Sequence, residues 1–313
     1  MALGMKRRCA LKQLIGAGAV SFFARSLYGT PDAGEEPNYT IHSESRLVVL
    51  DVSVKDSRGA LVPGLTRECF RVTENGRPQS VTIFDNADIP VTVGLAIDES
   101  RSMTPKRGDV ITAAETFIRS SNPRDEIFVL NFNDTVRRGL PAGEPFSDNP
   151  LELRQALDRG RPEGKTALND AIVEGLQQLA VGRRDKKTLV VISDGGDNAS
   201  SHTHADVLRQ VERSIATIYA IGLYDAEDPD RKPGLLKHLA AISGGEAYFP
   251  ADAAGVIPVC RKIAREIRTR YTVGYVPKPE NGPGMRRIHV RVSSMDHRAL
   301  HARTRTAYWY GTE

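Results

Sequence analysis

The stretch "VTVGLAIDESRSM", residues 91–103, changes from an apolar pattern to a polar one. Its first part, Val91 to Ile97, is a nearly continuous apolar run, and an acid and two hydroxyls then follow at every second position. A continuous apolar run of this length is typical of a strand that helices cover on both faces, as in a parallel sheet. The polar residues Asp98, Ser100 and Ser102 either end the strand as a turn or bind one ion together.

The alternation of strand and helix continues along the chain. Apolar runs at 125–132, 187–194 and 216–223 predict three further strands. Stretches with apolar residues at spacings of three and four predict helices near 106–121, 150–158, 167–180, 205–215, 234–242 and 255–270. Because strands and helices alternate in this order, we predict an α/β fold over residues 89–268 with a doubly wound, mostly parallel sheet.

The residues on either side of this region have the alternating pattern of antiparallel strands. Three candidate strands precede it, at 44–56, 69–76 and 79–85. Neither flank is long enough to bury a core by itself. We therefore predict that residues 40–88 and 269–313 form one β-sandwich-like annex, with the α/β domain inserted between its two halves. An isolated C-terminal hairpin is the alternative.

Residues 1–29 have the order of an export signal. They contain five basic residues and no acid, and their apolar stretch from Leu14 to Ala24 is far shorter than the roughly 20 residues that a spanning helix needs. The segment "RRCALK" also resembles a twin-arginine signal, although Ala10 replaces the usual bulky residue. We therefore expect an exported protein, periplasmic or extracellular, with no transmembrane span in the mature chain.

Net charge bears on the class of partner, and the two cysteines outside the predicted signal bear on disulfide formation. Without the five basic residues of the signal, 38 basic residues remain against 39 acidic ones, a net charge of −1. This balance does not indicate a nucleic acid partner. Cys69 and Cys260 can pair in an oxidising compartment, or each can be buried separately as a thiol. The sequence leaves the oligomeric state open.

Polar side chains occur at or near the carboxyl ends of the predicted strands, where open α/β sheets bind ligands. Besides the group that begins at Asp98, these are Thr166 in "EGKTALND", directly before a helix, and Asp194 in "VVISDGGDN", at the end of an apolar strand. All of these side chains offer oxygen, which favours a hard ion. A site with only two carboxylates suits Mg²⁺ or Mn²⁺, which keep waters in an octahedral shell.

The patterns D-x-S-x-S, G-x-T-x-L and S-D-G-x-D-N together resemble the metal-ion-dependent adhesion site of von Willebrand factor type A (VWA) domains. The segment "LAAISGGEAYFP" is similar to a late segment of that family, and both flanks resemble those of exported bacterial VWA-related proteins. The resemblance implies a Rossmann-like fold over 89–268. It also implies a binding module of the adhesion type, which captures an Asp or Glu of a protein partner through Mg²⁺.

The resemblance also assigns a role to each site residue. Ser100, Ser102 and Thr166 would supply hydroxyl oxygens to the metal. Asp98 and Asp194 would hold it largely through waters. Where the family more often has glycine, this chain has an arginine at position 101, whose cation either attracts an acidic ligand or crowds the ion.

Two other functions stay open as alternatives. A metal-assisted hydrolase would need a base near the ion, and Glu99 and Asp197 are the only candidates in the ligand loops. The chain has no G-x-S-x-G elbow, no phosphate loop ending in G-K-[ST] and no C-x-x-C pair, so we expect that it is not an enzyme. The remaining alternative is a structural envelope component with an idle metal site.

Overall fold

The computed structural model describes residues 47–194, 196–224, 233–278, 282–297 and 299–311. The predicted export signal, residues 1–29, lies outside the described residues. The described residues belong to one compact unit, Ser45–Glu313. No helix among them has the length and apolar character required to cross a membrane.

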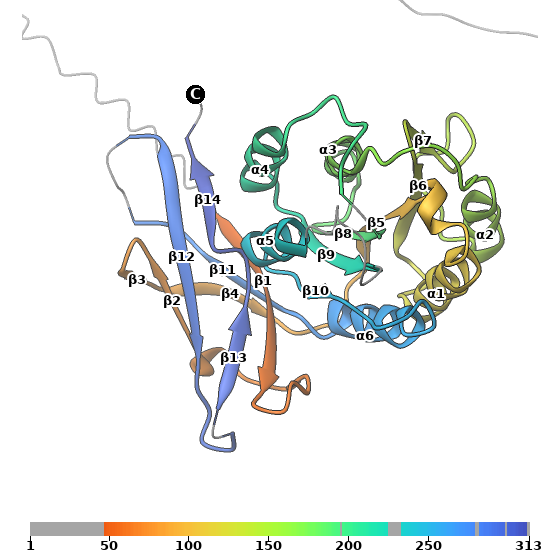
Figure 1. The fold of residues 1–313 in the computed structure, drawn as a ribbon. Helices are drawn as coiled ribbons and strands as arrows, with labels where there is room; N and C mark the ends of the chain where they lie inside the picture. Colours follow the sequence, from red (N-terminus) through yellow and green to blue (C-terminus); the bar gives the residue numbers. More distant parts are fainter. Residues whose placement is uncertain (1–46, 195, 225–232, 279–281, 298, 312–313) are drawn as a thin grey trace, which may run out of the picture. The chain divides into compact units, whose positions relative to one another are not determined.

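The central sheet of the described chain consists of β5 (Val91–Asp98), β6 (Glu126–Phe132), β7 (Val136–Arg138), β8 (Lys186–Ser193), β9 (Thr217–Gly222) and β10 (Ala247–Tyr248). The strand order is β10-β9-β8-β5-β6-β7 (Figure 1). Every neighbouring pair is parallel except β6 and β7. This is the mostly parallel sheet that the apolar runs predict. The edge strand β7 is not predicted, because three residues are too few to show a periodicity.

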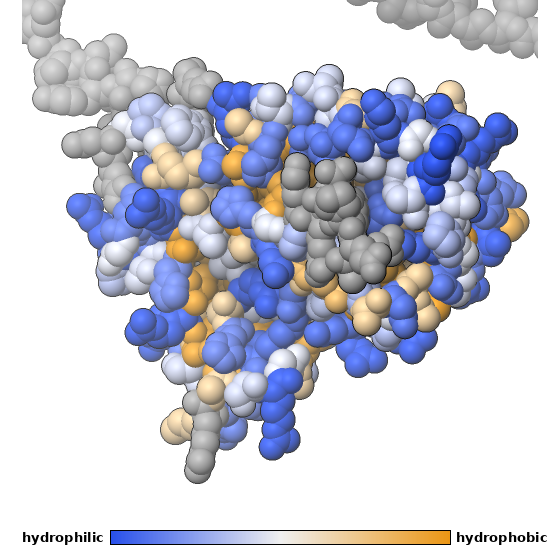
Figure 2. Space-filling view, in the orientation of Figure 1, coloured by the Kyte–Doolittle hydropathy of each residue, from blue (hydrophilic) through white to orange (hydrophobic). Residues whose placement is uncertain are grey.

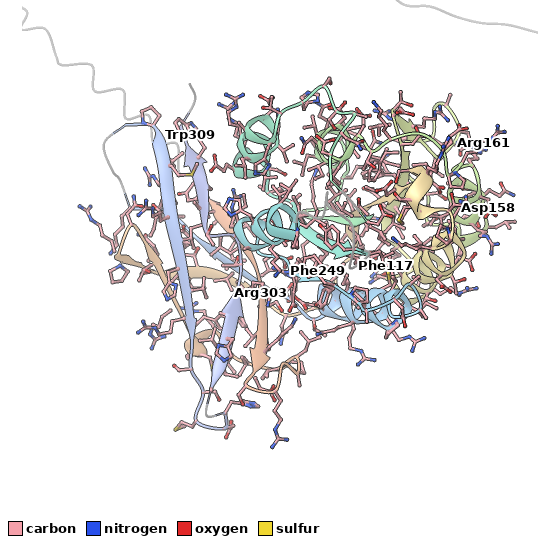
Figure 3. The ribbon with its side chains drawn as sticks, in the orientation of Figure 1. Phe117, Asp158, Arg161, Phe249, Arg303 and Trp309 are labelled. Carbon is pink, nitrogen blue, oxygen red and sulfur yellow. The ribbon has the colours of Figure 1, made fainter. Side chains whose placement is uncertain are left out.

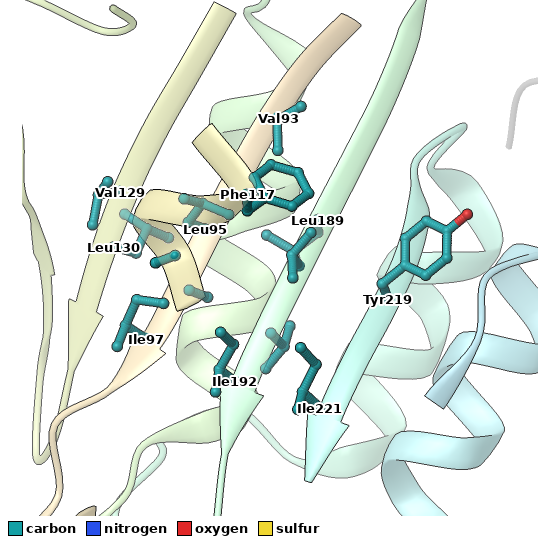
Figure 4. Close-up of a cluster of buried hydrophobic side chains, with 14 of the residues drawn as sticks. Val93, Leu95, Ile97, Phe117, Val129, Leu130, Leu189, Ile192, Tyr219 and Ile221 are labelled. Atoms are coloured by element: carbon teal, nitrogen blue, oxygen red, sulfur yellow. The ribbon is translucent and has the colours of Figure 1, made fainter. Parts of the chain in front are cut away.

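Helices cover both faces of this sheet. They are α1 (Arg107–Ser120), α2 (Pro150–Asp158), α3 (Leu168–Ala180), α4 (His204–Arg213), α5 (Pro233–Ser243) and α6 (Val256–Arg268). Helices α1 and α6 pack against each other on one side of the sheet, and α3 packs on β5 and β8 from the other side (Figure 1). Every residue of β5 is consequently buried. Figure 4 shows Leu95 of β5 among the aliphatic side chains of β6 and β8, near the ring of Phe117 from α1.

The flanking strands form two antiparallel sheets. Their bounds are β1 (Val48–Asp56), β2 (Phe70–Glu74), β3 (Arg77–Gln79), β4 (Val81–Asp85), β11 (Tyr271–Tyr275), β12 (Gly284–Val292), β13 (Leu300–Arg303) and β14 (Ala307–Tyr310). One sheet has the order β13-β1-β11-β4 and the other β14-β12-β2-β3. Each sheet contains strands from both ends of the chain, so the C-terminal segment is not an isolated hairpin.

The two annex sheets share one hydrophobic core. The ring of Phe70 on β2 lies 5.0 Å from that of Tyr271 on β11 and 5.2 Å from that of Phe84 on β4, measured between ring centroids.

Cys69 borders the core of the annex, and Cys260 is buried in the core of the α/β domain. Both residues are free thiols. The apolar side chains are thus gathered in two cores, and the face drawn in Figure 2 is mostly hydrophilic.

A buried arginine joins the annex to the α/β domain. Arg270 is 1% exposed, and it lies between the end of α6 and the start of β11. Its Nε is 2.9 Å from Asp51 Oδ2 on β1, its Nη1 donates to the Tyr219 hydroxyl on β9 at 2.8 Å, and its Nη2 donates to the Gly244 carbonyl at 3.0 Å. One guanidinium therefore binds both parts of the unit.

Glu266 on α6 is the fully buried anion of this junction. Lys55 Nζ, from β1, lies 2.6 Å from Glu266 Oε2, and the Tyr219 hydroxyl donates to Glu266 Oε1 at 3.0 Å. Burial raises the pKa of Glu266, but the charges of Arg270 and Lys55 prevail and hold it below its ordinary value. A second anion, Glu246, pairs with Lys55 and with Arg303. Figure 3 labels Arg303, which lies on β13.

The Glu266→Gln variant tests whether this charge cluster couples the two parts. We expect it to lower the free energy of unfolding by about 3 kcal/mol, because buried cations lose their counter-charge. Two probes follow urea unfolding. The single tryptophan, Trp309 on β14 (Figure 3), reports on the annex, and the helical circular dichroism signal reports on the α/β domain. In the wild type the two transitions should coincide.

The Glu174→Gln variant is the matched control, because Glu174 forms an exposed pair with Arg138. It should change stability by less than about 1 kcal/mol. Equal effects of the two substitutions would contradict a coupling role for Glu266.

Candidate metal centre

The strand β5 ends in a buried carboxylate. Asp98 is 1% exposed, and both of its oxygens accept hydrogen bonds. The backbone N–H of Ser100 donates to Oδ1 at 2.8 Å, and the Ser193 hydroxyl donates to Oδ2 at 2.6 Å. The first of these bonds closes a tight turn directly after the strand, as an aspartate in this position commonly does.

The turn brings a second carboxylate into the same network. Ile97 of β5 pairs with Ile192 of β8, so the two strands end side by side. The Ser102 hydroxyl donates to Asp194 Oδ1 at 3.0 Å, and it lies 3.1 Å from the Ser100 hydroxyl. The structure thereby brings together four of the five predicted site residues, Asp98, Ser100, Ser102 and Asp194.

The loop that carries Thr166 contacts both other loops through its backbone. The N–H of Arg101 donates to the Gly164 carbonyl at 3.2 Å, and the Thr166 N–H donates to Asn198 Oδ1 at 2.8 Å. Gly164 has φ +74°, and a Cβ there would lie 1.8 Å from Asp134 Oδ2, so this turn requires glycine. Among the described residues, no hydrogen bond joins the Thr166 hydroxyl to the other four predicted side chains.

Burial and a neighbouring negative charge perturb the first carboxylate. Burial is the main cause that raises the pKa of Asp98, and the charge of Asp194 adds to it. Hydrogen bonds from Ser100 and Ser193 oppose this rise but leave the pKa at about 6. At neutral pH the site therefore holds two carboxylates, one of which is destabilised by its surroundings.

Lys106 is a residue of this site that the sequence analysis missed. Its Nζ donates to Asp194 Oδ2 at 3.0 Å and to the Leu223 carbonyl, just after β9, at 2.9 Å. It directly precedes α1, four residues after Ser102. No spacing in the sequence signals this contact, because it depends on how three strand ends meet.

The two candidate bases for hydrolysis are both engaged in structural contacts. Arg107 Nε donates to Glu99 Oε2 at 2.8 Å, and a Cβ at Gly160 would lie 2.0 Å from Glu99 Oε1. Asp197 Oδ1 accepts the N–H of Leu168 at the first turn of α3, at 3.1 Å. Each carboxylate thus stabilises a neighbouring segment of the fold.

Arg101 is exposed at the start of a short 3₁₀ turn, Arg101–Met103. Its carbonyl accepts the Thr104 hydroxyl at 2.7 Å, which fixes the backbone of the turn. No described residue forms a hydrogen bond or an ion pair with its guanidinium. The cation is consequently exposed beside the loops that carry the site.

The donor set fits a hard divalent cation. It offers only oxygen, from two buried carboxylates and from serine hydroxyls, and the exposed Ser102 gives access from solvent. The raised pKa of Asp98 is a further sign, because a cation between these carboxylates would relieve their repulsion. Within the described ranges, no three His, Cys, Asp or Glu side chains form a metal-binding group.

The Asp98→Asn variant tests the electrostatic strain at the site. The rise in the pKa of Asp98 from 3.8 to about 6 corresponds to a cost of about 3 kcal/mol at neutral pH. In the presence of a chelator at pH 7.5, the variant should therefore be more stable than the wild type, by up to about 3 kcal/mol. Urea unfolding measures this difference.

The pH dependence of the free energy of unfolding gives a second test of the strain at Asp98. Folded Asp98 takes up a proton as the pH falls through about 6, whereas the unfolded carboxyl does so only near 3.8. The wild type should thus gain stability as the pH falls from 7.5 to 4.5, and the advantage of the variant should shrink. Asp148→Asn, at an exposed position, is the control. A variant that is less stable than the wild type at pH 7.5 would refute the strain.

Comparisons with known proteins agree with this fold. A von Willebrand factor type A protein from Catenulispora acidiphila is 15% identical, with a TM-score of 0.52, and the match covers 85% of this chain and 74% of that one. The conserved hypothetical protein BatB from Bacteroides thetaiotaomicron is 14% identical, with a TM-score of 0.45 over 56% of this chain and 97% of that one. At 15% identity, the likeness to the first of these structures concerns the fold.

A third similar structure is that of proximal thread matrix protein 1 from the mussel byssus with a zinc-occupied MIDAS motif. It is 13% identical, with a TM-score of 0.47 over 58% of this chain and 48% of that one. No curated protein sequence matches the chain. The family model of the von Willebrand factor type A domain matches residues 93–258, just over half of the chain, and the chain therefore belongs to the VWA family.

Proposed function

We propose that this chain is an exported binding module whose VWA domain holds Mg²⁺ or Mn²⁺ and captures an acidic group of a protein partner. The observation that carries the proposal is the connected set of Asp98, Ser100, Ser102 and Asp194 at the carboxyl edge of the sheet. The four side chains offer only oxygen atoms to an ion, and no other carboxylate among the described residues belongs to the set. An ion held in this way would retain a position for one more carboxylate.

The residues of the chain have separate tasks in this proposal. The hydroxyls of Ser100, Ser102 and Thr166 would bind the ion directly, and Asp98 and Asp194 would hold it largely through waters. Ser193 keeps the Asp98 carboxylate oriented through its 2.6 Å hydrogen bond. The exposed guanidinium of Arg101 would attract an acidic partner toward the site.

Two observations support binding over catalysis at this centre. Glu99 is held by Arg107, and Asp197 is held at the start of α3, so neither carboxylate is directed at the site as a general base. We therefore propose that the domain is not enzymatic. Export is proposed on the sequence of residues 1–29 alone, which combines basic residues with a short apolar stretch.

Metal titration tests the first half of the proposal. Isothermal calorimetry of the wild type with Mn²⁺ and then Mg²⁺ should show one site per chain. Asp194→Ala should weaken binding at least about tenfold, because it removes one of two carboxylates from the donor set. The exposed Asp148→Ala variant should bind like the wild type. Equal heats for the wild type and Asp194→Ala would instead favour an idle site in a structural component.

Partner capture tests the second half. The wild-type chain, immobilised in Mg²⁺, should retain a partner from the native envelope that a chelator releases, because the ion bridges the two proteins. Asp98→Ala should not retain it, and Asp148→Ala should. Capture that a chelator and Asp98→Ala leave unchanged would contradict the proposal. Metal-dependent turnover of ester or phosphate substrates, abolished by Asp194→Ala, would replace it with hydrolysis.

A further inference from the structure

The loop after β5 supplies a donor to each oxygen of Asp194. The Ser102 hydroxyl bonds Oδ1 at 3.0 Å, and the Lys106 ammonium bonds Oδ2 at the same distance. The Leu223 carbonyl accepts a second hydrogen bond from the same ammonium at 2.9 Å. A lysine of the chain itself is thus fixed in contact with a carboxylate of the candidate metal centre.

This ion pair is largely removed from water. The Lys106 side chain is 12% exposed and that of Asp194 is 3% exposed. Charges in such surroundings are weakly screened, so the pair interacts far more strongly than one on the surface. The ammonium neutralises only one of the two carboxylates. It leaves the site anionic, and it adds a fixed positive charge where a divalent cation would bind.

We propose that Lys106 is a tethered counter-cation that competes with the divalent ion for Asp194 and makes metal binding depend on the acidic ligand. The inference rests on the proposed function. With Lys106 and a divalent ion both present, positive charge exceeds the charge of the two carboxylates. A carboxylate from the partner restores the balance, and each ligand then raises the affinity of the other by the same factor.

Because of this coupling, Lys106 makes tight binding depend on the presence of both the ion and the acidic group. The ion alone binds weakly, because an ammonium already satisfies Asp194 Oδ2. The acidic group alone also binds weakly, because most of the positive charge of the site is then engaged with Asp194. Tight binding requires both, so the site holds its ion mainly while a partner is attached.

The Lys106→Met variant tests the competition. Methionine keeps most of the length and the apolar stem of lysine but removes its charge. We expect Mn²⁺ alone to bind this variant at least about tenfold more tightly than the wild type, because the repelling charge is gone. Lys106→Gln, which keeps a donor, should behave similarly. Lys106→Arg, which keeps the charge, should bind like the wild type. Calorimetry or Mn²⁺ electron paramagnetic resonance measures each dissociation constant.

Lys165→Met is the matched control, since Lys165 is an exposed lysine next to Thr166 and its ammonium forms no hydrogen bond or ion pair with a described residue. It should change Mn²⁺ affinity by less than about threefold, as expected for a screened surface charge. Circular dichroism in a chelator checks that each variant is folded. Should Lys106→Met not fold, the comparison of Lys106→Gln with Lys106→Arg carries the same test.

A second titration in glutarate measures the coupling. Glutarate, a small dicarboxylate, should tighten Mn²⁺ binding more in the wild type than in Lys106→Met. Equal Mn²⁺ affinities of the wild type, Lys106→Met and Lys106→Gln would overturn the role of Lys106 and leave the metal-binding proposal standing. Tighter Mn²⁺ binding by the neutral variants without partner capture would support Lys106 as a competitor and overturn the proposed function. Absence of Mn²⁺ binding in every variant would overturn both.

Discussion

The parallel register of β5 and β8 brings the candidate ligands of the metal centre together. Ile97 pairs with Ile192, so both strands end at one edge of the sheet, and the chain turns there with a carboxylate on each strand. The register requires close packing along β5. A Cβ at Gly94 would lie 2.4 Å from Phe128 Cζ on β6 and 2.9 Å from Leu189 Cδ1 on β8, so a side chain at this position would displace the side chains of both neighbouring strands.

The same register brings two carboxylates close together, and other groups of the chain offset their repulsion only in part. Two carboxylates at the end of a buried sheet repel each other and lose their hydration. Ser100 and Ser193 donate to Asp98, Ser102 donates to Asp194, and Lys106 adds a full positive charge. The pKa of Asp98 nevertheless stays near 6. A site that retains such strain is poised to accept a cation, and this is what a binding function would require of it.

At the junction between the annex and the α/β domain, the surroundings favour the charged form of a buried carboxylate, whereas at the metal centre they disfavour it. Arg270 and Glu266 are both almost fully buried. Each of them forms an ion pair with a residue of opposite charge and a hydrogen bond with the Tyr219 hydroxyl. The pKa of Glu266 is consequently lowered, whereas that of Asp98 is raised. At the junction, ion pairs neutralise the buried charges, whereas at the sheet edge one ammonium faces two carboxylates and leaves a net negative charge that suits a cation. The cluster at Glu266 and Arg270 therefore joins two parts of the fold, whereas the cluster at Asp98 and Asp194 is suited to binding.

Features that depend on neighbouring residues could be predicted from the sequence alone. The apolar run before Asp98 predicts a strand covered on both faces, and the structure has that strand at Val91–Asp98. Alternation in the C-terminal segment predicts β12, whose residues alternate between buried and exposed from Met285 onward. Local pattern also placed Asp194 at a strand end, which is why the candidate ligands were found without coordinates.

Contacts between distant groups depend on the tertiary structure and could not be predicted from the sequence. Lys106 and Asp194 are 88 residues apart, and Asp51 and Arg270 are joined through a junction that no periodicity encodes. Strands β13 and β14 are separated by only three residues in the sequence, 304–306, yet they belong to different sheets. The physical reason is that periodicity reports which face of an element is buried, whereas charge pairing and sheet membership depend on what lies against that face.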